Sequence, residues 1–398
     1  MEYELRKVGT VRLSRRFAAR LAMFYAAIFA LGGCHLPFFP VWLKAVGIDA
    51  GWIGVISAVP ALTRFTVLPV VTSLAERHAA LRGAMIATAA ITTIGFVAIS
   101  TQHWPLAVFL VYAATAAAWT PTVPLTDAYA LRGVVQHGLD YGPVRLWGSA
   151  AFIAGALGCG WFADLIPAKH LIWIIAAVAA LAALVSLGLQ PLEGRKTQIP
   201  VQHNSRALLR DPGFLAIIAA SALIQGSHST YYVFSAITWQ FAGLNGLTIA
   251  ALWAIGVVAE IVVFALSPRF TLQPSTLVTI GGLAALARWL ITAQAPPVGV
   301  LAVVQLAHGL SFGLTQLGTM GLMVRHVPMP VVTRAQGYLA ACSGIVSSGA
   351  SIVSGMIYAR YGESAYYAMA AMALSGAVIM WSARKYLAAH PQKVTSGG

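Results

Sequence analysis

Charged residues are scarce in this sequence: they make up 9% of its 398 residues, whereas hydrophobic residues make up 59%. A soluble domain averages roughly 25% charged residues, so the composition excludes an ordinary water-soluble protein. A helix of about 20 apolar residues crosses the hydrocarbon core of a bilayer. About twelve apolar runs of that length follow one another along the chain, separated by short polar connections. The sequence therefore predicts an all-α membrane protein.

Acidic residues are fewer than basic ones, with 11 Asp and Glu against 25 Lys and Arg, which gives a formal net charge of +14. In a soluble chain this excess would suggest nucleic acid, but here the basic residues gather in alternate connections. The other set of connections holds Lys44, Lys169 and Arg360. By the positive-inside rule, the chain is a multi-pass protein with both termini in the cytoplasm. Nucleic-acid binding is a poor interpretation, since no folded domain remains to hold a basic patch.

Cysteine is rare, and Cys34, Cys159 and Cys342 each fall inside a predicted span. An odd number at such positions argues against a disulfide framework. The sequence has no HExxH metal motif, no paired aspartate motif for metal or phosphate and no nucleotide-binding loop. It therefore predicts no enzyme, no metal site and no cofactor, and it disfavours ATP-driven export.

One long polar interval, residues 190–213, separates six predicted spans from six. The predicted domains are an N-terminal six-helix bundle (1–190), a cytoplasmic central loop (191–213) and a C-terminal six-helix bundle (214–398). A faint internal repeat supports this division, because two short motifs recur at nearly the same offset. Gly47-Ile48-Asp49 is echoed by Gly243-Leu244-Asn245 at an offset of 196, and Gly160-Trp161-Phe162 by Gly355-Met356-Ile357 at an offset of 195.

Two charges in the first half, Asp127 and Arg145, lie among residues otherwise suited to lipid or protein contact. An ionised side chain in hydrocarbon costs several kcal/mol unless it faces a wet cavity or a partner, so both are candidate functional residues. Arg145, Gly148 and Phe152 share one helix face by steps of three and four residues. This face suits an oxygen-rich or anionic group beside an aromatic ring. Alternatively, Arg145 only marks the cytoplasmic end of its span.

Arg64 lies near the middle of the span predicted at about 52–74. A cavity or an ion pair would explain it, and the alternative is a side chain that extends to the membrane surface. In the span at about 214–241, four polar or aromatic residues recur at helical spacing: Gln225, His228, Tyr231 and Tyr232. They line a cavity or, alternatively, form hydrogen bonds between helices.

Three ionisable residues occupy successive spans of the second half: Glu260, Arg288 and His308. A carboxyl group inside a span can carry a proton across the membrane. Arg288 and His308 could each neutralise Glu260, which would make its proton affinity depend on the positions of the helices. That dependence is what coupled transport requires. Alternatively, His308 is a hydrogen-bonded packing residue.

Five stretches closely resemble, in sequence, the bacterial 3-phenylpropionate transporter family of the major facilitator superfamily. More loosely, they resemble lactose permease and the nucleoside:proton symporters. The stretches are LPFFPVWLKAVGID, VPLTDAYA, LDYGPVRLWGSAAFI, LIQGSHSTYYVFSAITWQ and LWAIGVVAEIVVFALS. The likeness extends over the first ten spans and thins in the last two. A weaker signal is the loop at Glu76 and Arg77, which is similar to a superfamily signature although Thr72 replaces its usual glycine.

This resemblance implies the major facilitator fold, with 12 transmembrane helices in two parallel six-helix bundles (6+6) and a substrate site near the midplane. It also implies a proton-driven symporter of a bacterial inner membrane. Arg145 matches the substrate-contacting arginine of the lactose-permease-like relatives, while Glu260, Arg288 and His308 match their span-eight, span-nine and span-ten residues. Those relatives carry an acidic residue beside the histidine. Here Gly309 follows His308 instead, which leaves the final proton acceptor open and shifts the role to Glu260 or Asp127.

The function predicted from these observations is secondary active symport of a proton and a small aromatic monocarboxylate, similar to 3-phenylpropionate, by alternating access. Arg145, with Arg64 or Arg288, would attract the carboxylate. The residues predicted to contact the rest of the solute are Trp147, Phe152, Gln225, His228, Tyr231 and Tyr232. Glu260, Asp127, Arg288 and His308 would couple it to the proton. The chain is expected to act as a monomer in the lipid bilayer. The alternatives are a nucleoside or oligosaccharide proton symporter, a channel, or a polytopic membrane enzyme.

Overall fold

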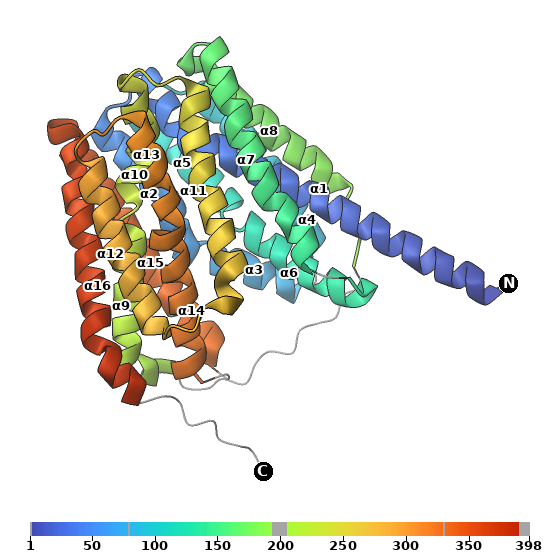
Figure 1. Cartoon of the computed structure of the whole chain (residues 1–398). Helices are drawn as coiled ribbons and strands as arrows, with labels where there is room; N and C mark the ends of the chain where they lie inside the picture. The colour runs from blue at the N-terminus through green and yellow to red at the C-terminus, as the bar shows by residue number, and fades with distance from the viewer. Residues whose placement is uncertain (1, 79, 140, 193–204, 329–330, 390–398) are drawn as a thin grey trace. The chain divides into compact units, whose positions relative to one another are not determined.

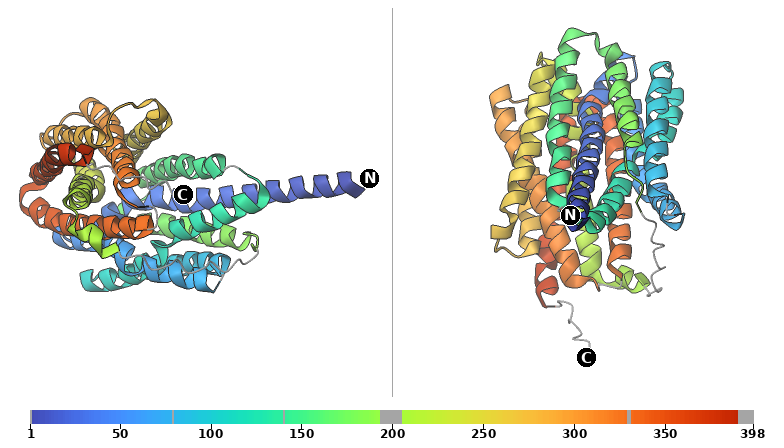
Figure 2. Two further views of the ribbon diagram at one scale, coloured as in Figure 1. Left: turned by 90° about the horizontal axis from the view of Figure 1, so that it is seen from below. Right: turned by 90° about the vertical axis from the view of Figure 1, so that its right-hand side faces the viewer.

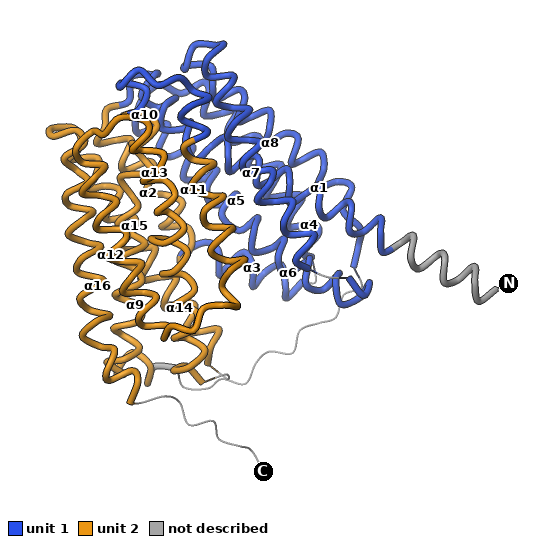
Figure 3. Tube along the Cα trace, in the orientation of Figure 1, with its two compact units in different colours: residues 1–48, 66–199, 239–251 blue, residues 49–65, 200–238, 252–398 orange. Residues whose placement is uncertain are grey.

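The computed structural model describes residues 2–78, 80–139, 141–192, 205–328 and 331–389 (Figure 1). Within these ranges the regular elements are helices, as the apolar runs predict. By their internal contacts the residues divide into two compact units, shown in Figure 3. Unit 1 holds residues 1–48, 66–199 and 239–251; unit 2 holds residues 49–65, 200–238 and 252–398.

The helices of unit 1 come mainly from the first half of the chain. They are α1 (Glu2–Ala45), α3 (Leu68–Arg77), α4 (Leu81–Ser100), α5 (Pro105–Trp119), α6 (Thr122–His137), α7 (Tyr141–Leu165), the 3-10 helix η1 (Ala168–His170) and α8 (Leu171–Leu187). α1 runs without a break from Glu2 to Ala45, although it contains Pro37 and Pro40; its N-terminal part can be followed in Figure 2.

The helices of unit 2 come mainly from the second half. They are α2 (Ala50–Thr66), η2 (Ser205–Arg210), α9 (Pro212–Gly226), α10 (Ser229–Phe241), α11 (Gly246–Leu266), η3 (Ser267–Arg269), α12 (Pro274–Thr292), α13 (Val298–His308), η4 (Gly309–Leu314), α14 (Thr315–His326), α15 (Val332–Tyr361), η6 (Gly362–Ser364) and α16 (Ala365–Ala389). The last residues of α10 and the first turn of α11 belong to unit 1.

Nine helices in the described ranges are long and apolar enough to cross a membrane, or ten if the bent pair of α2 and α3 is one span. One of the nine, Val332–Ala389, has 58 residues. At 1.5 Å per residue it would measure about 87 Å, whereas a bilayer core measures roughly 30 Å. Gly362, with a φ of 55°, divides it into α15 and α16. α9 and α10 form one further span broken at Ser227 and His228. These two additions raise ten to the twelve spans of the predicted major facilitator fold.

The division of the chain at a central loop stays a prediction. The contact-based units exchange two segments relative to it, because residues 49–65 group with unit 2 and residues 239–251 with unit 1. Most of the predicted loop, residues 193–204, lies outside the described ranges.

The internal repeat seen in the sequence has a structural counterpart at two turns. Gly47 and Gly243 both adopt left-handed backbone conformations, with φ of 89° and 85°. Two residues later, Asp49 Oδ1 accepts a hydrogen bond from the Trp52 amide over 3.1 Å, and Asn245 Oδ1 accepts one from the Thr248 amide over 2.8 Å. Each turn therefore ends one helix with a glycine and starts the next with a side-chain cap.

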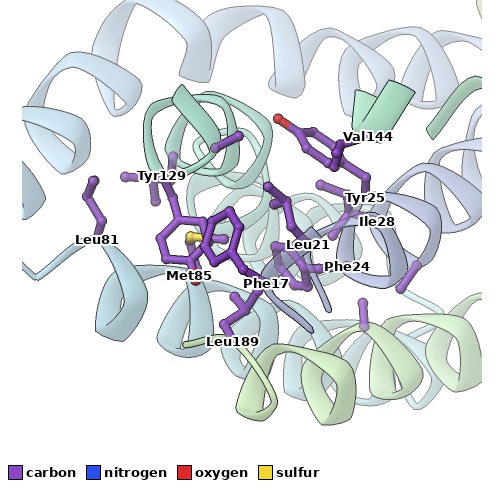
Figure 4. Packing of buried hydrophobic residues seen from close by; sticks show 14 of the residues in the cluster. Phe17, Leu21, Phe24, Tyr25, Ile28, Leu81, Met85, Tyr129, Val144 and Leu189 are labelled. Carbon is purple, nitrogen blue, oxygen red and sulfur yellow. The ribbon is translucent and has the colours of Figure 1, made fainter. Parts of the chain in front are cut away.

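The core of unit 1 is built on one face of α1 (Figure 4). Phe17, Leu21 and Phe24 follow one another at steps of four and three residues, so they lie on the same side of the helix. All three are almost completely buried. Gly133 on α6 makes room for them, since a Cβ there would overlap the ring of Phe17. This packing fixes α1 beside α6 and so keeps Tyr25, the residue after Phe24, in place.

Candidate functional site

The carboxylate of Asp127 is the centre of a polar cluster in unit 1 that joins α1, α6 and α7. The hydroxyl of Tyr25 on α1 donates to Asp127 Oδ1 over 2.6 Å, and the hydroxyl of Tyr141 on α7 donates to the same oxygen over 3.0 Å. Arg145 Nε lies 3.9 Å from this oxygen. The carboxylate therefore has two donors and a cation beside it, which offsets the cost of a charge inside a membrane.

The guanidinium of Arg145 lies over the ring of Phe29 on α1, with its central carbon 4.1 Å from the ring centroid. Gly148 makes this possible, because a Cβ there would lie 2.9 Å from Arg145 Nη1 and 3.0 Å from the Phe29 ring. The Arg145 side chain keeps 30% of its surface exposed. A planar cation fixed on an aromatic ring and partly open on its other side suits a carboxylate.

The aromatic residues predicted beside Arg145 lie elsewhere on α7. Phe152 packs against α1, and a Cβ added to Gly32 would lie 3.6 Å from its ring. Trp147 is 60% exposed. The ring under the guanidinium therefore belongs to Phe29, and the role of Phe152 and Trp147 in solute contact stays a prediction.

A second polar cluster, in unit 2, is centred on Arg288 of α12, whose residue surface is 1% exposed. Its Nη2 donates to Gln305 Oε1 over 2.7 Å, and its Nη1 lies 2.8 Å from His308 Nδ1. Nη1 also donates to Ser311 Oγ over 3.4 Å. Gln305 and Ser311 are neutral side chains, and His308 can be neutral. Both terminal nitrogens of the guanidinium therefore have protein partners, whereas its buried Nε has no hydrogen-bond partner among the described residues.

The contact with Arg288 determines how His308 meets Glu260. A guanidinium has only donors, so His308 Nδ1 must accept the hydrogen bond and a neutral ring carries its proton on Nε2. That Nε2 lies 3.8 Å from Glu260 Oε2 on α11. His308 is thus a neutral bridge between a buried cation and a carboxylate whose side chain is 27% exposed.

Ser311 and His228 extend this cluster towards the break in the seventh span. His228 is fully buried, and its Nε2 lies 3.2 Å from Ser311 Oγ while its Nδ1 lies 3.1 Å from the carbonyl oxygen of Ile224. Ser311 belongs to the π-helix η4. A π-helix displaces side chains relative to an α-helix and often marks a functional site. Two irregular helices therefore meet at this hydrogen bond.

The run Gly309–Gly313 has the G-x-S-x-G spelling of a hydrolase nucleophile turn, with Ser311 at its centre. In a hydrolase this serine stands on a sharp turn between a strand and a helix. Here it lies inside a membrane span as part of η4. Ser311 therefore serves the polar cluster around Arg288.

Aromatic rings enclose the Arg288 cluster. The guanidinium carbon lies 4.6 Å from the ring centroid of Tyr231 and 4.5 Å from that of Trp289. Tyr231 also stacks on Trp253, with ring centroids 4.6 Å apart. Tyr232 stacks on His228 at 5.9 Å. The predicted tyrosines therefore belong to one aromatic layer with His228, and burial among rings helps to stabilise the buried cation.

Arg64 is an exposed residue on α2 and lies near Tyr232. Tyr232 in turn lies near Glu260 and Arg288. The carbonyl oxygen of the Gln225 side chain is buried and has no hydrogen-bond partner among the described residues. Unit 2 therefore brings together most of the residues predicted from the second half of the sequence, and Arg64 with them.

Several residues of the two clusters were not predicted from the sequence: Tyr25, Phe29, Tyr141, Trp253, Trp289, Gln305 and Ser311. Tyr25 and Phe29 are four residues apart on α1, and Gln305, His308 and Ser311 recur at steps of three. This spacing could have placed each group on one helix face. Which other helix that face meets is a property of the packing alone.

No group of three or more His, Cys, Asp or Glu side chains that could hold a metal ion occurs within the described ranges.

Comparisons with known proteins agree with this arrangement. The model of the MFS_1 like family matches residues 18–369. A protein of Escherichia coli (strain K12) named "Probable 3-phenylpropionic acid transporter" is 30% identical over 365 residues, which cover 89% of this chain and 94% of that protein. A maltose permease of Geobacillus stearothermophilus is 26% identical over 87% of this chain and 89% of its own length.

Solved structures show the same fold. The crystal structure of the nucleoside transporter NupG aligns with a TM-score of 0.80 at 18% identity, and the alignment covers 93% of this chain and 99% of NupG. These relatives and neighbours are transporters, so the fold and the prediction that the chain is not an enzyme are confirmed. The chain is a multi-pass membrane transporter for a small organic solute.

Proposed function

Because the chain belongs to the MFS_1 like family, we propose that it carries a small aromatic monocarboxylate, similar to 3-phenylpropionate, together with a proton by alternating access. The observation that carries the proposal is the position of Arg145: its guanidinium lies on the Phe29 ring and is partly exposed. A carboxylate joined to an aromatic ring matches a cation and a ring held side by side. The relative named as a 3-phenylpropionic acid transporter supports this solute class.

In this proposal the carboxylate of the solute contacts Arg145, and Arg64 stays a second proposed carboxylate ligand from the sequence. Arg64 has an exposed residue surface, as a solute ligand needs. Arg288 serves a different purpose, because it is almost completely buried and both terminal nitrogens of its guanidinium are hydrogen-bonded to the protein. Phe29 provides apolar contact beside Arg145, while Trp147, Phe152, Gln225, His228, Tyr231 and Tyr232 stay proposed solute contacts from the sequence.

Glu260 is the proposed proton carrier. Through His308 and Arg288, the charge on Glu260 affects the positions of the helices that carry these residues, α11, α12 and α13. While Glu260 is ionised, it balances the buried charge of Arg288 through the neutral ring of His308. A proton on Glu260 Oε2 removes that balance, which leaves a buried cation with neutral partners at a cost. Alternating access requires that the two conformations bind the proton and the solute with different affinity. The uncompensated charge of Arg288 supplies that difference in affinity.

Asp127 is a second proposed proton carrier. A proton on its carboxyl group would weaken its attraction for Arg145, which lies 3.9 Å away. Arg145 would then meet a solute carboxylate with less competition.

The first prediction tests coupling in proteoliposomes with an imposed pH gradient. Glu260→Gln keeps the size of the side chain but cannot take up a proton and release it, so accumulation against a gradient should fall to the level of passive exchange. Glu363→Gln, in η6 and outside both clusters, is the matched control and should accumulate the solute normally. Unchanged pH-driven accumulation by Glu260→Gln would remove Glu260 from the mechanism.

A nucleoside or oligosaccharide symporter is the second candidate, favoured by one observation: the Gln225 carbonyl oxygen is buried and has no donor among the described residues. Hydroxyl groups of a sugar would supply that donor. A thermal-shift screen of the purified protein against aromatic acids, nucleosides and sugars separates the two candidates, since a bound solute raises apparent stability. Protection by aromatic acids alone supports the carboxylate, and protection by a nucleoside or sugar alone supports the second candidate.

A further inference from the structure

The end of α7 and the beginning of α11 are joined by one carboxylate, that of Asp164. Its Oδ1 accepts a hydrogen bond from the Gly246 amide over 2.5 Å, and its Oδ2 accepts one from the Leu247 amide over 3.0 Å. The first amides of a helix have no partner within the helix. They also carry a partial positive charge that attracts an anion. Asp164 therefore caps α11 from a different helix.

The remaining amides at this helix start are satisfied from within the same segment. Asn245 Oδ1 accepts from the Thr248 amide over 2.8 Å, and the Asn245 carbonyl accepts from the Ile249 amide over 3.1 Å. When α11 moves, these two bonds move with it. The two bonds to Asp164 are different, because they persist only while α7 stays beside α11.

The backbones of the two helices cross closely one turn before this cap. A Cβ on Gly160 would lie 2.5 Å from the Gly246 carbonyl oxygen, and a Cβ on Gly246 would lie 2.4 Å from the Gly160 carbonyl oxygen. Ala250 completes the contact, since its Cβ would lie 2.7 Å from a Cβ on Gly160. Glycine at both positions lets the backbones meet, and this closeness brings Asp164 within reach of the amides of α11.

A related crossing in unit 2 lacks such a carboxylate. Gly54 on α2 and Gly355 on α15 meet in the same way, since a Cβ on Gly355 would lie 3.1 Å from the Gly54 Cα. Gly355 corresponds to Gly160 in the internal repeat, at an offset of 195. The same offset from Asp164 leads to Ala359, which has no oxygen in its side chain. One crossing is therefore packed and capped across helices, and the other lacks a carboxylate at the corresponding position.

We propose that Asp164 is a latch that holds the α7–α11 crossing closed. In the closed state its charge lies at the positive end of α11 and satisfies two amides. Separation of the helices breaks both bonds at once, so the latch stabilises the closed state of this crossing selectively. The proposal goes beyond the proposed function, because it depends on neither the identity of the solute nor the coupling ion.

The experiment measures how often the crossing opens. Ala250→Cys places a thiol on the buried contact of α11, in a background in which the partly exposed Cys342 is changed to serine. A water-soluble maleimide labels the purified protein in detergent, and the initial rate reports opening. Asp164→Ala should raise this rate about fivefold, the size expected for loss of a helix cap. Asp164→Asn keeps one acceptor oxygen and should give a smaller rise.

Asn245→Ala is the matched control, because it removes a cap from the same helix start without breaking the contact between helices. Its labelling rate should stay within about twofold of the parent, since only the local end of α11 is weakened. The latch is refuted by unchanged labelling with Asp164→Ala, or by an equal rise with Asn245→Ala. If Asp164→Ala does not fold, unchanged labelling with the more conservative Asp164→Asn refutes it equally. Transport is not measured, so a wrong solute assignment cannot affect the outcome.

Discussion

Arg288 uses both ends of its guanidinium on protein partners, whereas Arg145 lies on a ring and keeps part of its surface open. The chemistry of the two side chains is the same, so the difference comes from the surroundings. A buried guanidinium whose two terminal nitrogens are hydrogen-bonded to side chains fixes those side chains in place. A partly exposed one can still receive an anionic ligand. At the scale of single residues, this contrast separates the proposed coupling group from the proposed solute ligand.

The second prediction concerns Arg288→Lys. A lysine keeps the charge, but its compact ammonium cannot replace the planar fork that reaches Gln305 and His308 together. Loss of one hydrogen bond to a charged group costs about 1.5–3 kcal/mol. We therefore expect pH-driven uptake to fall by about tenfold or more, as initial rates in proteoliposomes would show.

Arg384→Lys serves as the control for Arg288→Lys, since Arg384 is half-buried near the end of α16 and lies outside both clusters. Its uptake should match that of the parent protein. Parent-like uptake by Arg288→Lys as well would mean that the charge alone suffices and that the orientation of His308 is unimportant.

At the scale of elements, two spans depart from a regular helix where the polar residues of unit 2 meet. The seventh span is interrupted at Ser227 and His228, and the tenth contains the π-helix Gly309–Leu314. Backbone groups released from a helix inside a membrane must find other partners. Here the Ser227 hydroxyl donates to the Ile224 carbonyl oxygen over 2.6 Å and accepts from Trp289 Nε1 over 2.9 Å. The irregular segments therefore place small polar side chains among the rings around Arg288.

The third prediction also belongs to the scale of elements and concerns the contact of α1 with α7. Gly148→Ala adds a Cβ that would crowd Arg145 Nη1 and the Phe29 ring, so the guanidinium must shift from its place on the ring. We expect solute affinity to fall several-fold, about 1 kcal/mol for a lost cation–π contact. Thermal-shift titration with the identified solute measures the change.

Gly158→Ala is the matched control for Gly148→Ala, because it lies on the same helix and a Cβ there meets nothing within 4 Å. It should leave affinity unchanged and, since alanine favours helix more than glycine does, raise stability slightly. Equal affinities for both variants would contradict the proposed role of the Arg145–Phe29 pair.

At the scale of the whole molecule, the sequence predicted the element types and most of their bounds. The span predicted at about 52–74 corresponds to α2 and α3, which together run from Ala50 to Arg77. Long apolar runs with few charges leave little choice of structure in a bilayer. The break between α9 and α10 was not predicted, although Gly226 and Ser227 form a glycine–serine pair of the kind at which helices kink.

The candidate site was predicted less completely than the fold. Ionisable residues such as Glu260 and Arg288 stand out in an apolar sequence because their burial is costly. Phe29 does not, since an aromatic residue in a span is ordinary. Its position under Arg145 depends on the packing of α7 against α1, and a pattern along one helix carries no information about the helix beside it.

The fourth prediction concerns orientation, which we propose as both termini in the cytoplasm of a bacterial cell. The basic residues of alternate connections support this orientation. A fluorescent protein fused after residue 398 should fluoresce in a bacterial host, and a periplasm-dependent phosphatase fused there should be inactive. The same phosphatase inserted after Leu244, in the connection between α10 and α11, should be active. The reverse pattern would overturn the orientation.

His308 lies 3.8 Å from Glu260 on one side and is bonded to a permanently charged guanidinium on the other, so the Arg288 cluster, unlike that of Asp127 in unit 1, offers Glu260 as its carboxylate for the coupled proton. If Glu260 alone carries it, each cycle moves one positive and one negative charge in the same direction. Such a cycle is electrically silent. The voltage across the membrane would then add nothing to accumulation, and the pH gradient alone would set how much solute the cell retains.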